Sequence, residues 1–420
     1  MRINTLALTG FRGIREHTLD FEGKSAIIFG INGAGKSSIL RAINLLFAPI
    51  ISRLTGHRTS AEMLLSAEDI SYQARECRLG CQCTLGNQGV EYSRQAQLQK
   101  SRLSAKRNPP VEFCNLFHQL YGEQSDAGQM PVFVNYGVHR LVLDIPLRIR
   151  RHHEFTQLSA LDKAIESKID FRTFFEWFRY QEDLENEQKI KLWNKDYQDK
   201  ALRAVRTAIY GMMENTSHLR IERRPLAMKL DKDGVPLSIN QLSDGEKGAL
   251  TLFGDLSRRL ALANPKLENP CLGEGIVLID EIDLHLHPSW QRSIVPALRR
   301  TFPNIQFIIT THSPQVLGEI DEGFRIYQVM RENNDIMVEA LPPLSGWSSG
   351  EILEQLMHTS SQNEAVRQDF HQIFAALKAQ DYASADERLQ LLKPSLYSKN
   401  VDLVRAEALL KLGKYRHDQN

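Results

Sequence analysis

The feature of this sequence that most constrains its fold is the glycine-rich segment GINGAGKSS at residues 30–38. The segment follows the apolar run SAIIF and precedes ILRAINLLF, in which apolar residues recur at helical spacing. Gly30, Gly35, Lys36 and Ser37 match the phosphate-loop pattern between a predicted strand and a predicted helix, as the pattern requires. We therefore predict an α/β fold in which phosphate groups bind at the start of a helix.

Each residue type in this loop has a task in phosphate binding. Glycines let backbone N–H groups turn toward the phosphates, Lys36 reaches the terminal phosphates, and the Ser37 hydroxyl binds Mg²⁺. An ordinary glycine turn is the alternative interpretation, which the strand–loop–helix context disfavours. We expect the helix to end at Pro49. The predicted ligands are ATP and Mg²⁺, and the predicted binding residues are Gly30, Asn32, Gly33, Ala34, Gly35, Lys36, Ser37 and Ser38.

Two apolar runs in the second half of the chain end in polar residues. IVLID closes on Asp280 and is followed by Glu281, and IQFIITT is followed by His312. In isolation, each could be a strand end that meets solvent, and a histidine there is commonly a surface residue. Because the carboxyl ends of parallel strands share one crevice, we expect Asp280 to order the water shell of a metal and Glu281 to polarise an attacking water.

The segment LSDGEK at residues 242–247 resembles the signature motif of ABC-type ATPases, in the form found in the Rad50/SMC/RecF/OLD-like branch. The phosphate loop, this signature, IVLIDE and ITTHS follow one another in the order of that family. The opening LTGFRGIREHTLDF also resembles the first strands of the branch, where an arginine at the position of Arg12 lies near the nucleotide. The resemblance is strong over residues 1–48 and 236–330 and loose between them.

The resemblance implies that two copies of the chain enclose two ATP molecules. Each ATP is bound by the phosphate loop of one copy and capped by Ser243 and Gly245 of the other. The resemblance also implies a role for each of the following: Glu281 as general base, Asp280 and Ser37 as magnesium ligands, His312 as the switch that senses the γ-phosphate, and Asp283 as the residue that signals across the dimer. The glutamine of the family's Q-loop has no clear counterpart and stays unassigned.

The expected fold class is α/β: an ABC-type ATPase head with a mixed, mainly parallel sheet core, an antiparallel β lobe, a helical insertion and a helical C-terminal tail. We predict four regions, namely the N-terminal half of the head at 1–150, the helical insertion and return strands at 151–235, the C-terminal half of the head at 236–345 and a helical region at 346–420.

Within the branch, the chain resembles compact ATPases rather than long-armed ones. The insertion is short and lacks sustained heptads, which excludes a long coiled-coil tether. Four segments resemble the PtuA-type subunits of Septu and retron anti-phage systems: PVFVNYGVHR, FFEWFRYQEDLEN, DEIDLHLHPSWQ and GWSSGEIL. This resemblance implies a separate HNH-type nuclease, PtuB-like, as partner, and in retrons a reverse transcriptase with its nucleic acid.

The charge of the chain gives no global sign of nucleic-acid binding. Lys and Arg number 52 and Asp and Glu 51, which leaves a formal net charge of +1, so a nucleic-acid surface must be a local patch. Two basic runs are candidates for DNA contact, and the alternative for both is a solvated surface. The first run spans 94–107, with Arg94, Lys100, Arg102, Lys106 and Arg107, and the second spans 148–153.

Cysteine spacing and hydropathy exclude further classes. Cys77, Cys81 and Cys83 alternate with polar residues in ECRLGCQCTL, which favours a half-buried strand over a metal site. No uninterrupted apolar run approaches the roughly eighteen residues of a membrane span, and the N-terminus lacks a secretory apolar region. We therefore expect a cytoplasmic protein without a membrane partner.

The predicted function is an ATP-binding and ATP-hydrolysing subunit of a bacterial anti-phage complex, which dimerises, or forms a higher homo-oligomer, around ATP and regulates the nuclease. The alternative is a RecF-like ATPase of DNA repair or recombination. An ATP-binding subunit of an ABC transporter is a third possibility, which the LSDGE form and the charged insertion disfavour.

Overall fold

The computed structural model describes residues 1–58, 61–99, 102–106, 110–122, 128–138, 155–332, 335–344, 346–357, 364–395 and 400–417. The chain forms two compact units, Met1–Trp347 and Ser348–Asn420.

The first unit is built on a six-stranded sheet of order β14-β13-β3-β12-β11-β7. The five parallel strands are β3 (Ser25–Phe29), β7 (Val132–Tyr136), β11 (Gly275–Ile279), β12 (Ile305–Thr311) and β13 (Phe324–Glu332), and β14 (Asp335–Leu341) joins the edge antiparallel to β13. Every residue of β7, β11 and β12 is buried, which explains why these runs lack polar alternation. The predicted parallel core is confirmed, and the carboxyl ends of β3, β11 and β12 lie at one edge.

A second, antiparallel sheet confirms the predicted β lobe and has the order β2-β1-β4-β5-β6. Its strands are β1 (Arg2–Phe11), β2 (Ile14–Asp20), β4 (Glu76–Leu85), β5 (Gln88–Gln99) and β6 (Arg102–Lys106). The three cysteines of β4 are buried with free thiols, as the half-buried strand requires. A small third sheet contains β8 (Thr216–Arg223), β9 (Leu226–Lys232) and β10 (Val235–Ser238).

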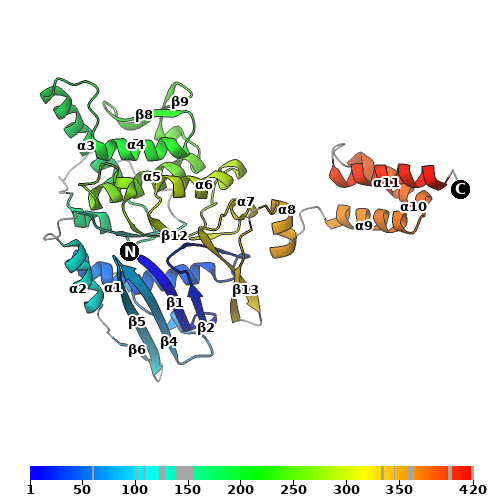
Figure 1. Ribbon diagram of the computed structural model, residues 1–420, viewed down its shortest axis with the longest axis horizontal. Helices are drawn as coiled ribbons and strands as arrows, with labels where there is room; N and C mark the ends of the chain where they lie inside the picture. Colours follow the sequence, from blue (N-terminus) through cyan, green and yellow to red (C-terminus); the bar gives the residue numbers. More distant parts are fainter. Residues whose placement is uncertain are drawn as a thin grey trace. The chain divides into compact units, whose positions relative to one another are not determined.

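Helices cover the core sheet on both sides. In Figure 1, α4, α5 and α6 lie on one side of β12, and α1 and the antiparallel sheet lie on the other. The helices of this unit are α1 (Lys36–Thr55), α2 (Val111–Tyr121), α3 (Phe171–Lys191), α4 (Lys200–Met212), α5 (Asp244–Ala263), α6 (Pro288–Thr301) and the single turn α7 (Pro314–Leu317). The expected helical insertion corresponds to α3 and α4.

Helix α1 does not end at Pro49, which corrects the sequence prediction. A proline inside a helix cannot donate a hydrogen bond to the carbonyl four residues earlier, here that of Leu45. The guanidinium of Arg94, on β5, donates to this Leu45 oxygen at 2.5 Å. The long-range contact compensates for the missing bond, and the helix continues to Thr55.

The same helix is long and apolar enough to cross a membrane, but 72% of its apolar window is buried inside the protein. Its side chains pack between the two large sheets. We therefore assign α1 to the core of the first unit.

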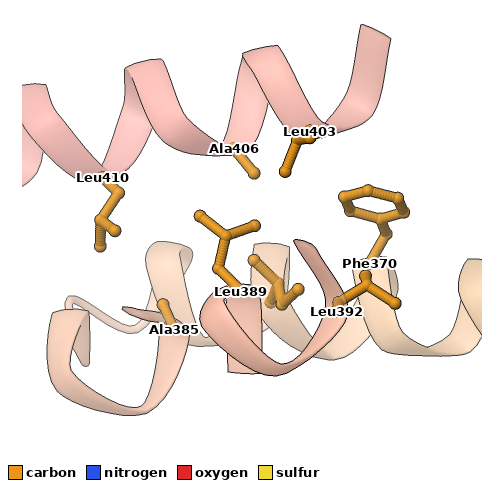
Figure 2. Close-up of a cluster of buried hydrophobic side chains, with 8 residues drawn as sticks. Phe370, Ala385, Leu389, Leu392, Leu403, Ala406 and Leu410 are labelled. Carbon is orange, nitrogen blue, oxygen red and sulfur yellow. The ribbon is translucent and has the colours of Figure 1, made fainter. Parts of the chain in front are cut away.

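The second unit contains α8 (Ser349–Glu351), α9 (Glu364–Lys378), α10 (Tyr382–Leu392) and α11 (Val401–His417), which confirm the predicted helical C-terminal tail. The last three helices enclose a core of their own, shown in Figure 2. The buried side chains are Phe370, Ile373, Ala385, Leu389, Leu392, Leu403, Ala406 and Leu410. The unit therefore has an independent hydrophobic core.

Candidate functional site

The loop between β3 and α1 adopts a backbone that needs glycine. Gly33 and Gly35 have φ of 80° and 111°, which side-chain-bearing residues rarely adopt. A Cβ atom at Gly30 would lie 2.2 Å from the carbonyl oxygen of Val329, and one at Gly35 would lie 2.3 Å from Ile336 Cδ1. The glycine spacing thus has steric causes in this fold, and it leaves a cradle at the start of α1.

The remaining loop residues lie around this cradle. Asn32 and Gly33 are exposed, whereas Ala34 is buried and donates its N–H to the carbonyl of Ile31 at 3.2 Å. Ser38 is buried in the first turn of α1. The exposed loop apex faces solvent, where a phosphate chain could enter.

Lys36 is buried and folds back over the loop. Its Nζ donates to the carbonyl oxygens of Gly30 at 2.9 Å and Ile31 at 3.1 Å. Burial lowers the pKa of Lys36, and a smaller opposing effect comes from three carboxylates across the crevice, those of Glu281, Asp280 and Asp283. The ammonium is therefore partly desolvated and lies inside the cradle, where an anion would be favoured.

The predicted magnesium ligands meet at the edge of the sheet. Ser37 Oγ donates to Asp280 Oδ1 at 3.1 Å, although the two residues are 243 positions apart. Thr310, two residues before His312, donates its hydroxyl to the same carboxylate oxygen at 2.5 Å. A hydroxyl and a carboxylate are oxygen ligands of the kind that Mg²⁺ prefers. These residues therefore fit a magnesium site.

The backbone at Glu281 is held in place by hydrogen bonds to Thr310 of the neighbouring strand β12. Its N–H donates to Thr310 Oγ1 at 2.8 Å, and the N–H of Ile282 donates to the Thr310 carbonyl at 3.0 Å. Its φ of 47° lies in the left-handed region, which is costly for a residue with a side chain. The bonds to Thr310 hold this conformation at the end of the strand.

His312 is oriented by a buried carboxylate of its own chain. His312 Nε2 lies 3.2 Å from Asp283 Oδ2, and Thr311 donates its hydroxyl to Asp283 Oδ1 at 2.6 Å. The side chain of Asp283 is 3% exposed and that of His312 is 41% exposed. Within one chain, Asp283 therefore acts as a positioning residue for His312, and its signalling across a dimer stays a prediction.

The signature segment forms the N-terminus of α5. Ser243 is the N-cap, and its side chain and that of Glu246 bond reciprocally to each other's backbone N–H. A Cβ atom at Gly245 would lie 2.8 Å from the carbonyl oxygen of His285. Ser243 and Asp244 are exposed. The signature thus presents a helix N-terminus, which attracts anions, to the outside of the unit.

Arg12 lies beside the first turn of α1, and its contact with a nucleotide stays a prediction. Its Nε donates to Asp69 Oδ1 at 3.1 Å and its Nη1 to Ser38 Oγ at 3.4 Å, while Arg41 bonds both oxygens of Asp69. Burial alone would raise the pKa of Asp69, but the bonds from Arg41 and Arg12 outweigh it and lower the pKa. Asp69 is therefore a buried carboxylate that fixes Arg12 near the cradle.

Only part of the predicted DNA surface can be placed. Arg94 donates to the Leu45 carbonyl, and burial lowers its pKa, which disfavours its place in a DNA-contacting run. Lys100, Arg107 and the run 148–153 lie outside the described residues, and so do the side chains of Arg102 and Lys106. DNA contact through these residues stays a prediction.

Sequence reasoning missed Thr310, Thr311 and Tyr136. Tyr136 ends β7, and its carbonyl accepts the N–H of Asp280 at 2.8 Å. The available signal was the presence of hydroxyl groups inside otherwise aliphatic strands, because a buried polar group needs a partner.

Comparisons with known proteins identify the family. A family model described as an AAA domain matches residues 5–204, and a second AAA-domain model matches 142–318. The Escherichia coli protein named "Retron Ec83 probable ATPase" is 31% identical, and the match covers 76% of this chain and 70% of that protein. The chain belongs to this retron ATPase family. An AAA domain implies that members of the family bind ATP.

A more distant relative, a Septu protein, agrees with the predicted resemblance. The Septu protein PtuA of Bacillus thuringiensis is 23% identical, and the match covers 84% of each chain. An SMC head domain from Thermotoga maritima is 17% identical, with a TM-score of 0.46 and coverage of 81% of this chain and 100% of that one. The resemblance to the retron and Septu ATPases is confirmed.

Proposed function

We propose that this chain hydrolyses ATP within an anti-phage defence complex and thereby controls an HNH-type nuclease. The observation that carries the ATPase proposal is the contact between Ser37 and Asp280 at the mouth of the cradle that holds Lys36. The names of the retron and Septu relatives support the assignment to defence.

The residues of the crevice have complementary tasks in this proposal. Lys36 and the backbone N–H groups of the loop bind the phosphates, and Ser37 and Asp280 hold Mg²⁺, which would neutralise phosphate charge. Glu281 accepts a proton from the attacking water, and His312, oriented by Asp283, contacts the γ-phosphate. Thr310 bonds both the Asp280 carboxylate and the Glu281 N–H, and so fixes the positions of these two residues relative to each other.

A second copy supplies the rest of each site. The N-terminus of α5, with Ser243 and Gly245, caps the nucleotide held by the other copy, because helix N-terminal N–H groups favour anions. The exposure of Ser243 and Asp244 supports this arrangement, since a residue that acts on another copy must reach the surface. ATP would then join the two copies.

The helical unit is the proposed docking surface for the nuclease. Helix α11 buries one apolar face in the core of the unit, yet it exposes a second set of apolar side chains, Val401, Val404, Leu409 and Leu412. A surface helix with a single buried face would carry polar residues at these positions. The exposed set fits a groove on a partner protein.

The ATPase proposal is tested with Glu281→Gln and Lys36→Ala in the full chain. Glu281→Gln keeps the shape of the side chain but cannot accept the proton, so it should bind ATP and hydrolyse it about 10²–10⁴-fold more slowly. Lys36→Ala should lose ATP binding. Nucleotide binding and phosphate release measure both effects. Wild-type turnover by Glu281→Gln would show that the assigned base is wrong.

The docking proposal is tested with Val404→Asp/Leu412→Asp and, as the matched control, Lys411→Asp on the same helix. The double variant should lose co-purification with the proposed HNH-type nuclease, and the control should keep it. Purified alone, the chain should hydrolyse ATP without cutting DNA. Retained association of the double variant, or DNA cleavage by the isolated chain, would contradict the proposal.

A further inference from the structure

A buried polar cluster joins β7 to α5, the helix that begins with the signature. The Tyr136 hydroxyl donates to Asp255 Oδ2 at 2.9 Å. Asp255 also accepts bonds from Arg258 Nη2 and Arg259 Nε, each at 2.7 Å. The side chains of Asp255 and both arginines are at most 3% exposed. Such a fully buried ionic cluster contributes little net stability compared with apolar packing.

The protonation states fix the direction of the tyrosine bond. Burial alone would raise the pKa of Asp255, but Arg259 and Arg258 outweigh it and lower the pKa, so the residue is a carboxylate and only accepts. Burial, and then the charge of Asp255, raise the pKa of Tyr136 well above its ordinary value. Tyr136 therefore keeps its proton and donates a hydrogen bond to the Asp255 carboxylate.

The backbone of the same tyrosine lies at the edge of the core sheet that carries the predicted magnesium ligand Asp280, which we call the magnesium edge. The N–H of Asp280 donates to the Tyr136 carbonyl at 2.8 Å, and Tyr136 pairs with Ile279 in the sheet. Asp255 lies on α5, whose N-cap is Ser243, about 18 Å along the helix at 1.5 Å per residue. One residue thus contacts both the signature helix and the strand edge that carries Asp280.

We propose that Tyr136 is a positioning residue that couples the signature helix to the magnesium edge of the same chain. The inference rests on the proposed function. When Ser243 engages the nucleotide of a second copy, a shift of α5 carries Asp255 with it. The Tyr136 hydroxyl transmits that shift to the end of β7, and so to the backbone of Asp280. Hydrolysis in one site then depends on engagement at the other.

Hydrogen bonds from two arginines hold Asp255 in place beside Tyr136. Asp255 cannot turn away from Tyr136, because Arg258 and Arg259 on its own helix hold it from the other side. Arg259 is itself anchored to the carbonyl oxygens of Ala160 at 2.8 Å and Asp162 at 3.0 Å. Because these bonds hold Asp255 in place on α5, a displacement of the helix changes the Asp255–Tyr136 bond along with the Arg259 contacts.

The test is Tyr136→Phe, which removes the hydroxyl and leaves Asp255 with both arginines. In the full chain, we expect ATP affinity within about twofold of wild type and a turnover number about tenfold lower. The matched control is Tyr327→Phe on β13 of the same sheet. Tyr327 is also buried and donates its hydroxyl to the Asp20 carbonyl at 2.7 Å, away from α5, so the control should keep wild-type turnover.

A double variant separates coupling from a structural role. If the tyrosine acts through engagement of the signature, Tyr136→Phe should cause no further loss in a Ser243→Arg chain, where engagement is already blocked. Wild-type turnover by Tyr136→Phe, an equal loss in Tyr327→Phe, or additive losses in the double variant would overturn the proposal. Absence of ATP hydrolysis by the wild-type chain would instead refute the proposed function, and the coupling would fall with it.

Discussion

The two halves of the proposed nucleotide site are built in opposite ways. At the edge of the core sheet, Ser37 and Thr310 both donate to the Asp280 carboxylate, although the three residues come from distant segments. At the start of α5, Ser243 bonds within its own helix, to Glu246, and is exposed. The first half is assembled by the fold of one chain, whereas the second is a surface feature.

This difference indicates a division between binding and hydrolysis. A preorganised edge can take up a nucleotide without rearrangement, since its polar groups are already placed. In the proposed arrangement, the exposed N-terminus of α5 acts on the nucleotide of a second copy and not on the cradle of its own chain. Changes in the first half should therefore affect the single chain, and changes in the second should affect only the assembled pair.

The largest effect is expected from the preorganised half. Asp280→Ala removes the carboxylate that Ser37 and Thr310 both contact, so magnesium-dependent ATP binding should weaken and hydrolysis should fall by at least about 10³-fold. Isothermal titration with and without Mg²⁺, together with phosphate release, measures this. Asp321→Ala, at an exposed aspartate paired with Arg299, is the control and should leave both unchanged. Hydrolysis by Asp280→Ala near the wild-type rate would remove Asp280 from the site.

A smaller effect with a different signature is expected from the exposed half. Ser243→Arg should leave ATP binding by the single chain intact, but it should block capping of the second copy's nucleotide and lower hydrolysis by about 10²-fold. Mixing this variant with Lys36→Ala restores one complete site from two defective chains, so part of the activity should return. Equal inactivity of every mixture would argue against the two-copy arrangement.

The two halves also differ in how far the sequence predicted them. Local patterns predicted the loop at residues 30–38 and the strand-end residues Asp280, Glu281 and His312. The parallel sheet brings these segments together, as expected. Thr310 escaped prediction because its role depends on the register between β11 and β12, which no local pattern encodes. Tyr136 escaped for the same reason, since its partner Asp255 lies 119 positions away.

The fold shows the same limit at two other places. Pro49 is a reliable helix terminator in a local pattern, but Arg94 from β5 compensates for its missing bond and the helix continues. Asp283 was singled out only for signalling across the dimer, and its contacts within the chain, with His312 and Thr311, were not foreseen. In both cases a long-range polar contact decides the outcome, and composition and periodicity carry no information about such contacts.

An intermediate effect tests whether the preorganised half depends on Thr310. Thr310→Val keeps the shape of the side chain and removes the hydroxyl that bonds Asp280 and the N–H of Glu281, so turnover should fall about tenfold with ATP affinity retained. Thr310→Ser restores the hydroxyl and should recover most of the activity. If the serine variant is as slow as the valine variant, packing rather than hydrogen bonding would explain the loss.

The smallest effect concerns α1, the helix that presents Lys36 and Ser37. Arg94→Met leaves the Leu45 carbonyl without its donor, and an unsatisfied buried carbonyl costs about 1–3 kcal/mol of folding stability. In a Pro49→Ala chain, the alanine N–H can bond that carbonyl, so the same Arg94 substitution should cost less. Chemical denaturation of the four chains in this cycle measures the difference. ATP turnover should not change, because Arg94 supports the middle of the helix and not its N-terminus. An equal cost in both backgrounds would mean that Arg94 stabilises β5 independently of Pro49.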